Sequence, residues 1–155
     1  MRPSNPLILA GFILLVLGGG TLIGTSTLPG EWYAGLQKPF FNPPNWIFGP
    51  VWTLLYVIIG NVGYRLWRSG LPRLQRLWWA QLGLNFIWSP LFFAAQLPAA
   101  ALIVIVLLFA LIIYMIHLSW TRDRVSSALL MPYAAWVGFA SLLNAVIVFL
   151  NSGVQ

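Results

Sequence analysis

Three apolar segments of the sequence carry aromatic and amide side chains at helical spacing. In the segment 46–67, Phe48, Trp52 and Tyr56 stand four residues apart, so they share one face of a helix. Indole and phenyl rings stack on large flat molecules, and a few amides fix the orientation of such a ligand. The stripes in the segments 77–96 and 128–150 comprise Gln81, Asn85, Trp88 and Phe92, and Tyr133, Trp136, Ala140 and Asn144.

Other kinds of site chemistry have few candidate residues. The sequence has no cysteine, one histidine (His117) and two acids (Glu31 and Asp123) that fall between apolar segments. These residues offer no acid–base pair, and a single histidine without cysteine makes a weak metal site. We therefore expect no metal site and no required cofactor.

Composition places the stripes in a membrane. Of 155 residues, 60% are hydrophobic and 6% are charged, which is too little polar surface to coat a water-soluble protein. A helix needs about 20 apolar residues to cross a bilayer. We predict an all-α integral membrane protein, a single domain over residues 1–155 formed by a bundle of five transmembrane helices. The predicted spans are 6–27, 46–67, 77–96, 98–120 and 128–150.

Amides at membrane depth must face protein or a cavity, because lipid offers them no hydrogen-bond partner. Gln81, Asn85 and Asn144 could hydrogen-bond between helices, each contributing about 0.6 kcal/mol, or they could line a ligand cavity. Periodicity alone favours neither interpretation. Gly20 and Gly24 form a GxxxG pattern that suits packing within a monomer or in a homodimer.

The net charge of +6 is explained by topology rather than by nucleic acid. Five spans would place Lys38 alone on one side and seven arginines on the other, which predicts a cytoplasmic N-terminus and an outer first loop, most simply in a bacterial cell membrane. Basic residues there would also attract anionic lipid headgroups. The four tryptophans beside arginine-bearing turns, Trp67, Trp78, Trp79 and Trp120, are expected at the membrane interface.

Residues 28–46 form a long first loop that contains four prolines and five aromatic residues. Proline fixes its own backbone and favours an extended residue before it, so Pro39, Pro43 and Pro44 predict a stiff segment. Such a segment could cover the outer end of the bundle as a lid. The alternative is a loop that rests among the headgroups.

The sequence closely resembles the translocator protein family, also called tryptophan-rich sensory proteins or peripheral benzodiazepine receptors. The resemblance is carried by WYAGLQKPFFNPPNWIFGPVWTLLY in the first loop and second span, AQLGLNFIWSPLFFA in the third and LLMPYAAWVGFASLLN in the fifth. It implies a five-helix bundle whose pocket binds protoporphyrin IX or related tetrapyrroles, as well as benzodiazepine- and isoquinoline-type ligands, beneath the first loop.

Family roles carry over to matching positions. Trp32 resembles the loop tryptophan that covers the pocket, and Pro43 and Pro44 resemble the prolines that shape the lid. Trp52 and Trp136 resemble two pocket tryptophans linked to light-dependent porphyrin breakdown. The pocket-wall positions matched on the third and fifth spans are Asn85, Trp88 and Ala140.

Two positions depart from the family pattern. Phe41 stands where relatives often carry tryptophan, so an indole N–H is missing from the loop. Ala145 and Phe149 stand where the sterol-recognition stretch of animal members needs a tyrosine and a basic residue. Sterol binding is therefore not expected at that site.

Three functions fit these features. The favoured one is a membrane receptor or sensor that regulates tetrapyrrole level, with porphyrin as ligand. The second is an enzyme that degrades porphyrin photo-oxidatively through Trp52 and Trp136, with porphyrin as substrate. A small-molecule transporter ranks last, because five spans form no equal inverted repeat and no buried charge marks an ion path.

Overall fold

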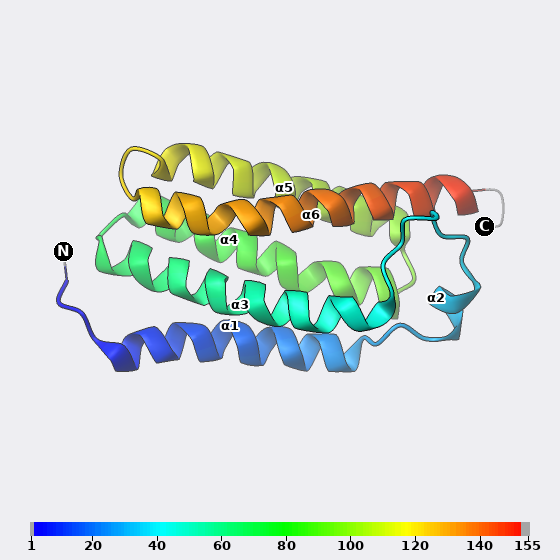
Figure 1. The fold of residues 1–155 in the computed structure, drawn as a ribbon, viewed down its shortest axis with the longest axis horizontal. Coiled ribbons are helices and arrows are strands. Elements are labelled where there is room, and N and C mark those ends of the chain that lie inside the picture. Colours follow the sequence, from blue (N-terminus) through cyan, green and yellow to red (C-terminus); the bar gives the residue numbers. More distant parts are fainter. Residues whose placement is uncertain (1, 153–155) are drawn as a thin grey trace.

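The computed structural model describes residues 2–152, which form six α-helices and one π-helical segment. The elements are α1 (Pro6–Ser26), α2 (Glu31–Gly35), α3 (Asn45–Arg68), α4 (Pro72–Ser89), η1 (Pro90–Ala94), α5 (Pro98–Ser119) and α6 (Arg124–Asn151). Five long helices lie side by side (Figure 1). The N-terminus and the turns after α3 and α5 lie at one end, the arginine end, and α2 lies at the other, the α2 end (Figure 1).

Proline and polar caps determine where the helices begin. The side chain of Asn5 accepts a hydrogen bond from the first turn of α1, and that of Asp123 accepts one from the first turn of α6. Pro72 and Pro98 occupy the first turns of α4 and α5, where a missing N–H costs little. The helix that overlaps the predicted third span 77–96 begins at Pro72, and the π-helical segment follows it at Pro90–Ala94.

Four helices in the described range are long and apolar enough to cross a membrane, namely α1, α3, α5 and α6. The all-helical prediction is thereby confirmed for residues 2–152. Helix α4 is less apolar, because its 18 residues include Arg73, Arg76, Gln81 and Asn85. Length and apolarity alone therefore support four spans rather than the predicted five.

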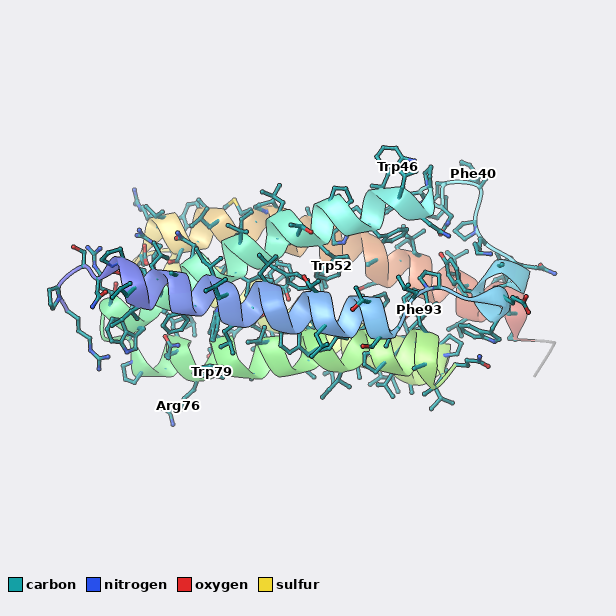
Figure 2. The ribbon with its side chains drawn as sticks, turned by 90° about the horizontal axis from the view of Figure 1, so that it is seen from below. Phe40, Trp46, Trp52, Arg76, Trp79 and Phe93 are labelled. Atoms are coloured by element: carbon teal, nitrogen blue, oxygen red, sulfur yellow. The ribbon has the colours of Figure 1, made fainter. Side chains whose placement is uncertain are left out.

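Trp78 is an internal residue of the bundle. Its side chain is fully buried and its indole Nε1–H donates to the carbonyl of Ile59 on α3 at 2.9 Å. The prediction that Trp78 lies at the interface was wrong, because consecutive helical residues point in different directions. Its neighbour Trp79 is half-exposed and points away from the bundle (Figure 2).

Glycines allow close helix packing in the middle of the bundle and toward the arginine end. A Cβ at Gly60 of α3 would lie 2.7 Å from the Cα of Ile13 on α1, so the two backbones touch there. Gly63 leaves room for the indole of Trp78 in the same way, and Gly20 of α1 leaves room for the ring of Tyr56. These helices can approach so closely only because the side chains are absent.

An ion pair joins α3 to the start of α6 at the arginine end. Arg65 Nη2 donates to Asp123 Oδ1 at 2.7 Å, and the Ser126 hydroxyl donates to Asp123 Oδ2 at 2.6 Å. Burial raises the pKa of this carboxyl, but the hydrogen bonds from Arg65 and Ser126 outweigh burial and hold the pKa of Asp123 below its usual value. Asp123 is thus a structural anion, and its charge is already partnered.

Substitution of Gly60 tests the backbone contact between α1 and α3. Gly60→Ala should destabilise the protein by about 1–3 kcal/mol, because the added methyl group forces the two helices apart. Thermal unfolding in detergent would show a lowered midpoint.

Gly11→Ala is the matched control, because nothing lies within 4 Å of a Cβ at that helical position. It should be neutral or stabilising by up to about 1 kcal/mol, the helix preference of alanine over glycine. Equal losses in the two variants would contradict the assigned contact.

Candidate functional site

A cavity of about 640 Å³ lies in the half of the bundle toward the α2 end. Its walls come from α1, α3, α4, η1 and α6, together with parts of the loop between α1 and α3. The lining side chains are aromatic, aliphatic, amide and hydroxyl groups, and no charged residue of the described chain is among them. Such a surface binds by shape, stacking and a few hydrogen bonds, and it offers no acid–base group.

Helix α3 supplies an aromatic wall. Phe48, Trp52 and Tyr56 all line the cavity, as their four-residue spacing predicts for one helix face. The ring centroids of Trp52 and Tyr56 lie 5.4 Å apart with their planes inclined by 30°, so the two rings pack against each other, and both border the cavity. Trp52 lies between α1 and α3 in Figure 2.

A chain of hydrogen bonds lies behind the cavity wall. Asn85 of α4 lines the cavity, and its Nδ2 donates to the Tyr133 hydroxyl on α6 at 2.9 Å. That hydroxyl donates to Gln81 Oε1, also at 2.9 Å. Gln81 and Tyr133 are fully buried and do not line the cavity. They therefore hold Asn85 in place and bridge α4 to α6.

A second polar relay fixes Trp88. Its Nε1–H donates to Asn144 Oδ1 at 3.2 Å, and Asn144 Nδ2 donates to the carbonyl of Pro98 at 2.8 Å. Trp88 and Asn144 both line the cavity. The amides at 81, 85 and 144 thus bridge helices, and two of the three, Asn85 and Asn144, also border the cavity.

The loop between α1 and α3 packs against η1 through aromatic rings. Tyr33 on α2 is buried, lines the cavity and lies 6.1 Å from Phe92 in an edge-to-face arrangement. Burial raises the pKa of the Tyr33 hydroxyl, which stays protonated and donates to Asn42 Oδ1 at 3.3 Å. The ring of Trp32 packs on the ring of Phe92, with centroids 5.9 Å apart, and Trp32 does not line the cavity.

Asn151 ties this loop to the end of α6. Its Oδ1 accepts from the Gln37 N–H and its Nδ2 donates to the Gln37 carbonyl, both at 3.0 Å. Lys38 donates to the carbonyls of Ala34 and Leu36 and lies over the Tyr33 ring. Its ammonium group therefore holds the loop together rather than facing the cavity.

Trp136 lies outside this cavity. It packs on Phe48, with ring centroids 5.8 Å apart, and borders a separate apolar groove between α3 and α6 that also contains Pro132. On α6, Ala140 follows Tyr133 by nearly two full turns, whereas Trp136 is rotated by about 60° from that line. Phe48 therefore stands between Trp136 and the cavity that Trp52 lines.

The predicted site residues fall into two groups. Those that line the cavity are Phe48, Trp52, Tyr56, Asn85, Trp88, Phe92 and Ala140. Those that support it from behind or outside are Trp32, Pro43, Pro44, Gln81, Tyr133 and Trp136. Pro43 and Pro44 nevertheless place Asn42 and Asn45, one on each side of them, at the cavity edge.

The wall contributed by α1 was missed by sequence analysis. Thr21, Gly24 and Thr25 line the cavity from a helix whose apolar sequence gave no stripe. Hydroxyls and glycine within an otherwise aliphatic run were the available signal. Within the single chain nothing lies within 4 Å of a Cβ at Gly24, so this glycine makes no close helix contact there.

Comparison with known proteins gives the family. The model of the TspO/MBR family matches residues 12–150. The chain is 45% identical to tryptophan-rich protein TspO of Archaeoglobus fulgidus, with 96% of this chain and 99% of that protein aligned. It is 34% identical to protein CrtK of Rhodobacter capsulatus (92% and 91% aligned) and 34% identical to human translocator protein (81% and 79% aligned). The resemblance found in the sequence is thereby confirmed, and the chain belongs to the TspO/MBR family of membrane proteins.

Proposed function

We propose that the protein binds a metal-free tetrapyrrole such as protoporphyrin IX in this cavity and serves as a membrane sensor or regulator of tetrapyrrole level. The observation that carries the proposal is the aromatic wall that contains Trp52 and Tyr56, beside a cavity of about 640 Å³. A porphyrin is a large flat π-system, so stacking supplies most of its binding energy. The same shape suits benzodiazepine- and isoquinoline-type ligands.

The side chains that line the cavity favour a ligand without a bound metal ion. The cavity lining contains no histidine, cysteine or acid among the described residues, and these are common ligands of metal centres. Asn85 instead offers an amide whose Oδ1 makes no hydrogen bond within the described chain. An amide oxygen can accept a hydrogen bond from a polar substituent of a ligand, whereas it is a poor ligand for a metal ion such as iron.

We further propose that all five long helices cross the membrane, with the loop from Thr27 to Pro44 as an outer lid. Helix α4 lies within the bundle between helices that are long and apolar enough to span, and its arginines lie at the arginine end, where they can extend to the headgroups (Figure 1). The concentration of arginines at that end supports a cytoplasmic N-terminus.

Reporter fusions after Arg122 and after Lys38 test this orientation. The first should report from the cytoplasm and the second from outside, because basic residues are retained on the cytoplasmic side. A cytoplasmic signal from the Lys38 fusion would show that the proposed orientation is wrong.

Substitutions in the cavity wall test tetrapyrrole binding. Trp52→Ala and Asn85→Ala should each weaken protoporphyrin IX binding by about 1–3 kcal/mol, because they remove a stacking surface and a buried hydrogen bond. Titration of purified protein in the dark, followed by tryptophan quenching, measures the change.

Trp79→Ala is the control, because Trp79 is half-exposed on the outer side of α4. The affinity of the Trp79→Ala variant for protoporphyrin IX should match that of the unmodified protein. A loss as large as that of Trp52→Ala would place the binding surface outside the cavity.

The second candidate function is photo-oxidative porphyrin degradation. Trp52 lines the cavity, so its indole could take part in such a redox reaction, whereas the lining offers no acid–base group. An indole that touches the pigment can donate an electron to its photo-excited state, and dioxygen would have to be the oxidant that finally accepts the electrons lost by the degraded pigment. A phenyl ring is far harder to oxidise than an indole. Trp136 cannot touch the same ligand, because Phe48 lies between them.

Trp52→Phe separates binding from degradation. The variant should keep most of the affinity, since phenylalanine preserves a flat ring, but should lose most light-dependent loss of pigment absorbance. Trp136→Phe should keep both properties, because its indole lies outside the cavity. Bleaching at the unmodified rate in Trp52→Phe would remove any redox role of that indole and leave the binding sensor alone.

A further inference from the structure

The half of the α1–α3 contact nearest the α2 end is open. Toward the arginine end the two backbones touch at Gly60, and Gly20 packs on Tyr56. Because the helices are antiparallel, the residues that follow Gly20 face the residues that precede Tyr56. There, a Cβ at Gly24 or at Gly49 would meet nothing within 4 Å. Figure 2 shows α1 and α3 diverging toward the end that carries Trp46, with Trp52 between them.

The residues on both sides of this opening are exposed and also line the cavity. They are Thr21, Gly24 and Thr25 on α1 and Gly49 and Thr53 on α3, here called the lateral slot. A residue that is both exposed and cavity-lining marks a mouth. The lateral slot is therefore an opening of the cavity on the side of the bundle.

The surroundings of the lateral slot are those of a lipid-facing surface. Both helices are long and apolar enough to span a membrane, and Leu22 and Leu54 beside the slot are 69% and 62% exposed. The hydroxyls of Thr25 and Thr53 donate to carbonyls of their own helices, Thr21 and Gly49, at 2.9 Å. Such hydroxyls expose no unpaired donor to lipid.

On the other approach, from water at the α2 end, Leu28, Pro29, Asn45 and Trp46 are also exposed and line the cavity, but the loop between them is fastened to α6 and η1. Asn151 makes two hydrogen bonds to the backbone of Gln37, and Tyr33 is buried against Phe92 and Phe93. Opening this side would break those contacts together. Entry through the lateral slot breaks none of these contacts.

We infer that ligands reach the cavity from within the bilayer through the lateral slot, so that the protein samples molecules dissolved in the membrane rather than in water. Its ligand class is then a planar amphiphile whose apolar body passes between α1 and α3. Leu28 and Trp46, both exposed and cavity-lining, flank the end of the slot nearest α2, where polar substituents could remain at the interface. This inference deepens the proposed function and shares its cavity.

A single cysteine in the cavity tests the route without porphyrin. The sequence contains no cysteine, and Ala140 is a buried cavity-lining residue, so Ala140→Cys provides one thiol inside. In lipid vesicles, a membrane-soluble maleimide should label this thiol, whereas a charged, membrane-impermeant maleimide should label it far more slowly. Labelling after denaturation gives the total thiol as a reference.

Variants that block the lateral slot test whether it is the entrance to the cavity. Gly24→Trp or Gly49→Trp, each added to Ala140→Cys, should slow labelling by the membrane-soluble maleimide by about tenfold or more, because the indole fills the slot. Gly18→Trp is the matched control: Gly18 is also exposed with open space on α1 but does not line the cavity. Its labelling rate should be unchanged.

Release of the loop tests the competing route. Asn151→Ala removes the contacts to Gln37, and it should leave labelling by the membrane-soluble maleimide unchanged if the lateral slot is the route. Faster labelling in Asn151→Ala, together with normal rates in both slot variants, would overturn the inference. Failure of protoporphyrin IX to bind would overturn the proposed function alone, because the labelling rates do not depend on porphyrin.

Discussion

The backbone contact between α1 and α3 at Gly60 determines where this bundle is solid and where it is hollow. Two helices that touch at one end and are inclined to each other must separate toward the other end. The separated halves can be filled only by large side chains, and Phe48, Trp52 and Tyr56 fill them in part. The space that these side chains do not fill is the cavity. Its position near the α2 end is therefore a consequence of close packing near the arginine end.

Polar groups inside the bundle follow a second constraint, because lipid cannot satisfy them. Almost every buried amide finds a partner on another helix: Asn85 on α6 through Tyr133, and Asn144 on α5 through Pro98. Such bonds contribute little stability each, but they fix the rotation of the helices about their axes. Among the described residues, three buried side-chain atoms have no hydrogen-bond partner, namely Gln75 Oε1, Gln81 Nε2 and Trp136 Nε1. Gln81 and Trp136 lie just behind residues that face the cavity.

The sequence was sufficient for the presence of the long helices and for the α3 wall, because a long apolar run and a four-residue spacing of aromatic residues both favour a helix. It was insufficient where two helices had to be positioned relative to each other. Trp136 belongs to the same periodic stripe as Ala140, yet a modest rotation places it against Phe48 instead of the cavity. Likewise, nothing in the loop composition indicated α2, whose five residues are held by packing on η1 rather than by propensity.

The distribution of polarity around the cavity narrows what can occupy it. Its walls are uncharged, its amides lie deep, and the hydroxyls of Thr25 and Thr53 donate to carbonyls of their own helices. A charged group on a ligand would find no counterion within the described cavity lining, and its desolvation would oppose binding. Charge must then remain outside, either at the edge of the loop or at the membrane interface beside Trp46. The cavity therefore selects molecules whose apolar and polar parts are spatially separated, and a flat ring system with substituents on one edge satisfies that geometry.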